Sequence, residues 1–143
     1  MNEKTFHVTS ESQLQEIARQ LAARIRKGTI LRLEGTLGAG KTTFVRALVD
    51  VLDGDPAQVS SPTFSIIHHY DANLPIAHID AYRLESDVEA RQAGIEELFD
   101  GEQVVLIEWP TKIEALIPPN AVTLDIRWLG ETEREIIFTE MAP

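Results

Sequence analysis

The chain has 143 residues, of which 43% are apolar and 25% charged, as is typical of one globular domain with little room for a second. It contains no cysteine, which excludes disulfide bonds, thiolate metal sites and a thiol nucleophile. The formal net charge of −10 disfavours direct binding of tRNA or DNA, because such binding needs a basic surface that displaces counterions. We expect a single domain over residues 1–143.

The first third of the chain reads as strand, helix, strand and helix. Residues 4–8 are predicted to form a short strand, within a polar amino-terminal stretch that lacks the apolar core of a signal peptide. A capping-box pattern, S-x-x-Q at 10–13, precedes an apolar spacing that predicts a helix ending at Gly28. TILRLE (29–34) reads as a strand, and the apolar face of TTFVRALVDVL (42–52) predicts a second helix.

The same alternation continues to the carboxyl end. Further strands are predicted at 63–70, 74–80, 103–109, 121–128 and 134–139, and further helices at 86–94 and 110–117. The longest apolar runs, such as VVLI at 104–107, are too short to cross a membrane, and we predict a cytoplasmic location. Strands alternating with helices predict an α/β fold with a mainly parallel sheet flanked by helices, closed by an antiparallel C-terminal hairpin.

A glycine-rich turn lies between the second predicted strand and the second predicted helix. GTLGAGKT (35–42) matches G-x-x-x-x-G-K-[ST] at every required position. The glycines let backbone N–H groups point at phosphate oxygens, and the helix that follows directs its positive end at the same anion. Lys41 supplies positive charge to the β- and γ-phosphates, and the Thr42 hydroxyl is suited to bind Mg²⁺. The pattern therefore predicts a nucleotide-binding loop.

Two acidic residues end predicted strands and are candidates for the Mg²⁺ shell. Asp80 ends PIAHID and Glu108 ends VVLIE, so both lie where ligands bind in open parallel sheets. Each carboxylate would bind the ion directly, bind it through water, or orient the attacking water, and the sequence does not separate these roles. The alternative for each is a solvated acid at the end of a strand.

Several other polar residues have plainer interpretations. Thr63 lies in SSPTFS (60–65), a position along the chain where switch proteins contact a γ-phosphate. The local sequence alone, however, favours the interpretation of Thr63 as an ordinary loop residue. His68, His69 and His78 are candidates for a metal site, but they are interpreted as structural, because His68 and His69 are adjacent on a strand and point to opposite faces. Arg83 is interpreted as a local packing or pairing residue, with an electrophilic role towards phosphate as the alternative. Trp109 is interpreted as a packing aromatic.

Five motifs occur together and in order: GTLGAGKTTF, SSPTFSI, HIDAYRL, AGIEELF and VVLIEWP. With them the chain resembles, from about residue 5 to 140, the bacterial TsaE (formerly YjeE) family, which are small ATPases of threonylcarbamoyladenosine synthesis. The resemblance implies a P-loop ATPase domain in which residues 37–42 surround the phosphates and Thr63 belongs to a switch-like loop. The residues that it implies for nucleotide binding are Leu37, Gly38, Ala39, Gly40, Lys41, Thr42, Thr43, Ser10 and Arg134. It places Thr42 and Glu108 near Mg²⁺ and makes Lys41, Asp80 and Glu108 the catalytic set.

The resemblance also implies a function and partners. TsaD, with TsaB, transfers the threonylcarbamoyl group to adenosine 37 of tRNAs that read ANN codons. A TsaE-like chain would bind their complex and hydrolyse ATP with Mg²⁺, weakly and under stimulation by the partners, to support repeated turnover without modifying tRNA itself. One position departs from the family pattern, because Thr36 stands where GDLGAGKT has aspartate. Nucleotide binding does not need that side chain, but a contact made by the carboxylate is put in doubt.

Three other classes of protein contain a phosphate loop. A GTPase would need a guanine-reading N-K-x-D, which the sequence lacks, and the residues after Asp80 are AYR, without the glycine of D-x-x-G. A small-molecule kinase would need an arginine-rich lid, and none is visible. The sequence gives little evidence against a third class, a non-enzymatic subunit in which bound nucleotide only stabilises an assembly.

Overall fold

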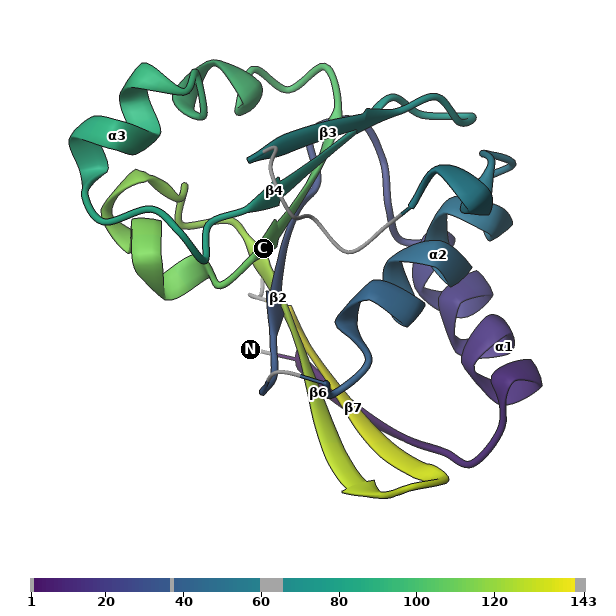
Figure 1. The fold of residues 1–143 in the computed structure, drawn as a ribbon. Helices are drawn as coiled ribbons and strands as arrows, with labels where there is room; N and C mark the ends of the chain where they lie inside the picture. Colours follow the sequence, from purple (N-terminus) through teal and green to yellow (C-terminus); the bar gives the residue numbers. More distant parts are fainter. Residues whose placement is uncertain (1, 37, 60–65, 141–143) are drawn as a thin grey trace.

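The chain folds around one seven-stranded sheet with helices on both faces (Figure 1). The computed structural model describes residues 2–36, 38–59 and 66–140. The strands are β1 (Asn2–Val8), β2 (Ile30–Glu34), β3 (Ile67–Tyr70), β4 (Ile76–Asp80), β5 (Val104–Glu108), β6 (Val122–Gly130) and β7 (Glu133–Glu140). The α-helices are α1 (Glu11–Ala22), α2 (Lys41–Val51) and α3 (Asp87–Gln92), and the 3₁₀ segments are η1 (Pro56–Gln58), η2 (Glu96–Leu98) and η3 (Pro110–Leu116). Within the described residues, no helix has the length and apolarity that a membrane span requires.

The strands follow the order β1-β7-β6-β2-β5-β4-β3. The four central strands β6, β2, β5 and β4 pair in parallel, whereas β7 and β3 are antiparallel to their neighbours. β1 is antiparallel to β7 and so runs in the direction of the central strands. The expected mainly parallel sheet with a C-terminal antiparallel hairpin is therefore confirmed. The carboxyl ends of β2, β4 and β5 consequently meet at one edge of the sheet.

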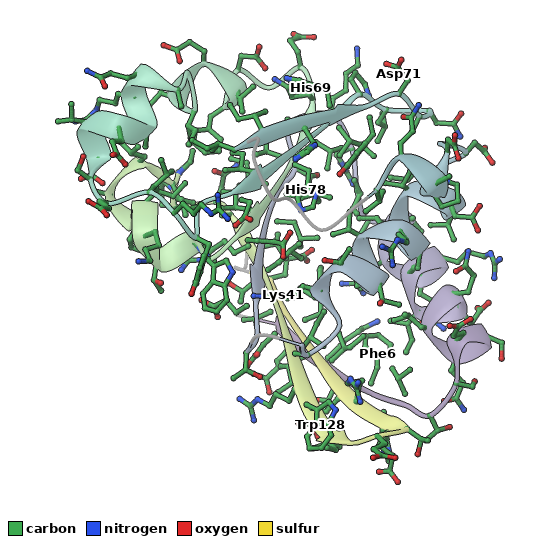
Figure 2. The ribbon with its side chains drawn as sticks, in the orientation of Figure 1. Phe6, Lys41, His69, Asp71, His78 and Trp128 are labelled. Atoms are coloured by element: carbon green, nitrogen blue, oxygen red, sulfur yellow. The ribbon has the colours of Figure 1, made fainter. Side chains whose placement is uncertain are left out.

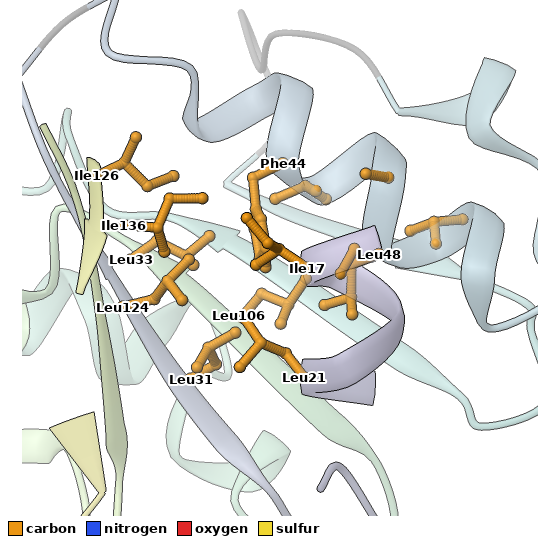
Figure 3. Close-up of a cluster of buried hydrophobic side chains, with 14 of the residues drawn as sticks. Ile17, Leu21, Leu31, Leu33, Phe44, Leu48, Leu106, Leu124, Ile126 and Ile136 are labelled. Atoms are coloured by element: carbon orange, nitrogen blue, oxygen red, sulfur yellow. The ribbon is translucent and has the colours of Figure 1, made fainter. Parts of the chain in front are cut away.

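Each face of the sheet has its own apolar core. Helices α1 and α2 cover one face together with η1, and α3 covers the other together with η2 and η3 (Figure 1). The α1–α2 core packs Ile17, Phe44 and Leu48 onto side chains of the central strands (Figure 3). Strand β5 is buried along its whole length, as its unbroken apolar run predicts. Burial of apolar surface from both helical layers holds the central strands in place.

Two helix starts carry a capping box, with a small change from the usual pattern. The Ser10 hydroxyl accepts from the Gln13 N–H at 3.2 Å, but the Gln13 side chain accepts from the Thr9 N–H rather than from that of Ser10. Ser86 and Glu89 repeat this arrangement at α3, where the Glu89 carboxylate accepts from the Glu85 N–H. In each helix the N-cap hydroxyl thus accepts a hydrogen bond from the first turn, and a side chain of the first turn accepts one from the residue before the N-cap.

Two predicted helices differ from the observed elements. The first ends at Ala22, well before Gly28, because the chain must turn there to bring the Gly28 N–H to the Gln103 carbonyl at 3.0 Å. The segment after Trp109 is a run of 3₁₀ turns with a kink at Ile113, and it is not an α-helix. Of the strand predicted at 63–70, only Ile67–Tyr70 is seen as β3, and residues 63–65 lie outside the described part of the chain.

Candidate functional site

The glycine-rich loop links the end of β2 to the start of α2. Gly35 has φ +148°, and a Cβ built on it would lie 2.6 Å from the Ile126 carbonyl oxygen of β6. Gly38 has φ +80°, and among the described residues no atom beyond its chain neighbours lies within 4 Å of its Cβ position. The first glycine therefore allows close packing against the sheet, and the second adopts a left-handed backbone conformation that favours glycine. Gly40 caps α2 without a side-chain hydrogen bond, so its first-turn N–H groups stay suited to an anion.

Lys41 is the first residue of α2, and its side chain is buried with 6% exposure. Its Nζ donates to the Gly35 carbonyl at 3.0 Å and lies 3.7 Å from the centroid of the Trp109 ring. Burial lowers the pKa of Lys41, and the negative charges of Glu108 and Asp80 oppose this shift. The ammonium is thus held at the loop by weak neutral partners and lacks a close anionic one among the described residues.

The two acids at strand ends lie side by side. Asp80 and Glu108 are register partners in the parallel pair β4–β5, at the carboxyl ends of both strands. Burial raises the pKa of Asp80, and the Tyr82 N–H that donates to its Oδ1 at 3.0 Å opposes the rise. Glu108 also raises the pKa of Asp80, whereas His78 and Lys41 lower it. Glu108 itself is buried, with 5% exposure.

These groups share one cleft of about 540 Å³. It is lined by Gly38, Gly40, Lys41, Thr42, Thr43, Asp80, Tyr82, Arg83, Glu108 and Trp109. Backbone N–H groups and an ammonium suit phosphate oxygens, while a hydroxyl and two carboxylates are the hard oxygen donors that Mg²⁺ prefers. The residues present therefore fit a Mg²⁺–phosphate group.

A second hollow of about 310 Å³ adjoins this cleft and shares Gly40 and Thr43 with it. The end of β1, the start of α1 and the β6–β7 hairpin form its walls, and Ser10 and Arg134 both line it. Arg134 donates from Nε to the Ala39 carbonyl at 2.9 Å and from Nη1 to the Gly130 carbonyl at 2.6 Å. The hairpin is thereby tied to the phosphate loop. Much of the lining is apolar, which suits a flat organic group beside the phosphate cleft.

The structure brings the candidate residues together in two places. Around the cleft it gathers Gly38, Gly40, Lys41, Thr42, Thr43, Asp80 and Glu108, and around the hollow Ser10, Ala39 and Arg134. Leu37 and Thr63 lie outside the described residues. Thr36 is exposed, and its carbonyl accepts from the Ala39 N–H, a main-chain bond that any residue at this position can make.

One buried residue beside the site is not among the candidates from the sequence. His78 is only 1% exposed and bonds the Glu108 carboxylate at 2.6 Å through Nε2. Period-two alternation puts His78 on the same face of β4 as Asp80, so the spacing of HID contains a signal for it. Trp109 and Arg83 also line the cleft. Trp109 packs against Lys41 and the Tyr82 ring, which agrees with its interpretation as a packing aromatic.

A strand, a phosphate loop and a helix, next to parallel strands that end in acids, define a P-loop NTPase fold. A family model described as "Threonylcarbamoyl adenosine biosynthesis protein TsaE" matches residues 8–136. The chain belongs to the TsaE family.

Individual relatives agree with this assignment. The tRNA threonylcarbamoyladenosine biosynthesis protein TsaE of Bacillus subtilis is 40% identical over 140 residues, covering 97% of this chain and 87% of the relative. The protein of the same name from Rickettsia conorii is 35% identical, covering 89% and 73%. The crystal structure of Bacillus subtilis YdiB is similar with a TM-score of 0.79 and 34% identity, covering 99% of this chain and 87% of that structure.

Proposed function

We propose that this chain binds ATP together with Mg²⁺ across the cleft and the adjoining hollow. The observation that carries the proposal is the meeting of Lys41, Asp80 and Glu108 at one edge of the sheet, beside the open phosphate loop. In this proposal the phosphates lie against residues 37–43, and the nucleoside occupies the hollow between Ser10 and Arg134. Thr63 would contribute from the segment that follows η1.

The proposed chemistry is slow hydrolysis of ATP. Thr42 and Glu108 would hold Mg²⁺, with Asp80 binding it directly or through water, and the bound ion supplies neutralisation of phosphate charge. Lys41 leaves its neutral partners, the Gly35 carbonyl and the Trp109 ring, for the phosphate oxygens, where its charge is better compensated. One of these two carboxylates, Asp80 or Glu108, would also orient the attacking water.

The proposed pathway is the formation of threonylcarbamoyladenosine at position 37 of ANN-reading tRNAs, in the cytoplasm. Residues 1–143 would act as one ATPase domain that assists the TsaB–TsaD threonylcarbamoyl transferase and is stimulated by it. Membership of the TsaE family and the names of the relatives support this proposal. The acidic composition also supports it, because a chain of net charge −10 is suited to a protein partner and poorly suited to hold tRNA itself.

The test follows phosphate release by the purified chain with ATP and Mg²⁺, alone and with TsaB and TsaD. We expect the partners to stimulate release, and Lys41→Ala and Glu108→Gln to reduce it by about 10²-fold or more. Lys112→Ala and Glu97→Gln alter exposed residues of the same types and are the matched controls.

A pulldown with ATP, ADP or no nucleotide tests the partners separately. Absence of association in ATP would contradict the proposed pathway, and normal hydrolysis by Lys41→Ala would contradict the proposed site. Nucleotide-dependent association without phosphate release would contradict hydrolysis and favour the role of an assembly subunit.

A further inference from the structure

A chain of buried polar side chains connects three neighbouring strands behind the acidic side of the cleft. The Tyr70 hydroxyl of β3 lies 2.9 Å from Nδ1 of His78 on β4, and Nε2 of His78 lies 2.6 Å from Oε2 of Glu108 on β5. Their exposed fractions are 3%, 1% and 5%, respectively. His78 lies in the interior near the middle of the molecule, as does Lys41 (Figure 2).

The direction of these hydrogen bonds follows from the groups involved. A carboxylate only accepts, so Nε2–H of His78 donates to Glu108, and in a neutral imidazole Nδ1 is then the acceptor. Burial raises the pKa of Tyr70 to about 12, with a further rise from Glu108 opposed by Arg46, so the hydroxyl keeps its proton and donates to Nδ1. Tyr70 thereby selects the tautomer of His78 that presents a donor to Glu108.

Packing between the strands does not by itself require a histidine at position 78. The neighbours of His78 on β4 are apolar and fully buried, and an apolar side chain at position 78 would bury no polar ring atoms. His78 instead engages Oε2 of Glu108, a residue that also lines the cleft. A hydrogen bond behind a metal-binding carboxylate fixes its orientation and raises metal affinity.

We propose that His78, oriented by Tyr70, is a positioning residue that holds the Glu108 carboxylate for the Mg²⁺ ion of bound nucleotide. The proposal rests on the proposed function, because it needs a nucleotide–metal complex in the cleft. It predicts that the hydrogen-bonded series Tyr70–His78–Glu108 affects the affinity for the metal ion but not the affinity for metal-free nucleotide. The reason is that the phosphate loop contacts the nucleotide independently of His78.

The test measures binding of Mn²⁺, as a paramagnetic substitute for Mg²⁺, to the purified chain saturated with ADP. Electron paramagnetic resonance gives the Kd for Mn²⁺, and isothermal titration gives the Kd for ADP without metal. We expect His78→Leu to raise the Kd for Mn²⁺ by about 10- to 100-fold and leave that for metal-free ADP unchanged. His78→Gln, which keeps a side-chain N–H, should recover most of the affinity, and Tyr70→Phe should cause a smaller rise. His69→Leu, on the exposed side of β3, is the matched control and should match the wild type.

The outcomes separate this proposal from the proposed function. If the wild type binds ADP and Mn²⁺ and a folded His78→Leu binds Mn²⁺ equally well, the positioning role is wrong and the nucleotide site stands. An equal loss of metal-free ADP affinity in His78→Leu would also overturn it, because the effect would be a general collapse of the site. If His78→Leu does not fold, Tyr70→Phe decides, and wild-type Mn²⁺ affinity in that variant overturns the proposal. A wild type that binds no nucleotide would overturn both proposals.

Discussion

Replacing Lys41 by Met separates the role of this residue in binding from its effect on the stability of the free protein. Burial lowers the pKa of Lys41 despite Glu108 and Asp80, so the folded structure disfavours the ammonium relative to water. Met has nearly the same length and can occupy the buried space of the lysine stem. The variant therefore removes a charge that the free protein stabilises poorly, and it also removes the cation that the proposed site offers to phosphate.

The opposing contributions to stability are of similar size. The variant loses a charge-assisted hydrogen bond to the Gly35 carbonyl, about 1.5–3 kcal/mol, and a cation–π contact with Trp109, about 1–2 kcal/mol. It gains the desolvation free energy of a buried ammonium, which is several kcal/mol. We expect the free energy of unfolding to change by less than about 1 kcal/mol. Ligand at one hundred times its Kd stabilises the wild type by about 2.7 kcal/mol, or roughly 5–10 °C in Tm.

Thermal unfolding of wild type and variant, with and without ADP and Mg²⁺, measures both effects. We expect similar Tm values without ligand and a ligand-induced rise in the wild type only. Lys112→Met, which changes an exposed lysine, should behave as the wild type does. The reasoning is refuted if Lys41→Met melts more than about 5 °C lower without ligand, or if it keeps the full rise with ligand.

Two further predictions concern the loop and the buried tyrosine. Gly35→Ala puts a Cβ 2.6 Å from the Ile126 carbonyl oxygen and should destabilise the chain by about 2–4 kcal/mol in urea unfolding. Gly38→Ala, whose Cβ meets no atom of the described residues within 4 Å, should cost about 1 kcal/mol, and equal losses would contradict the packing argument. As the pH rises from 10 to 12, the unfolded chain releases the Tyr70 proton near 10.0 and the folded chain keeps it to about 12. The free energy of unfolding should therefore fall by about 1.4 kcal/mol per pH unit more in the wild type than in Tyr70→Phe, and equal slopes in the two proteins would argue against the buried hydroxyl.

The sequence could predict the parts of the site that depend on neighbours in the chain. The phosphate loop is contiguous, so its glycines, Lys41 and Thr42 identify it without any tertiary information. The acids Asp80 and Glu108 could be predicted as a pair because parallel strands bring their carboxyl ends to one edge, and the register β4–β5 does place them side by side. The helix expected after Trp109 was wrong, since local apolar spacing does not distinguish an α-helix from kinked 3₁₀ turns.

Contacts between residues far apart in the sequence could not be predicted from local sequence patterns. His78 and Glu108 are 30 residues apart, and Arg134 and Ala39 are 95 apart, so their meeting depends on which strands become neighbours. That choice is made by the two apolar cores, which pack β2 between β5 and β6. The sequence by itself therefore determined the family and the chemistry of the loop, because both depend on residue types at fixed spacing. Only the tertiary structure decided that a buried histidine lies behind Glu108 and that the hairpin forms one wall of the second hollow.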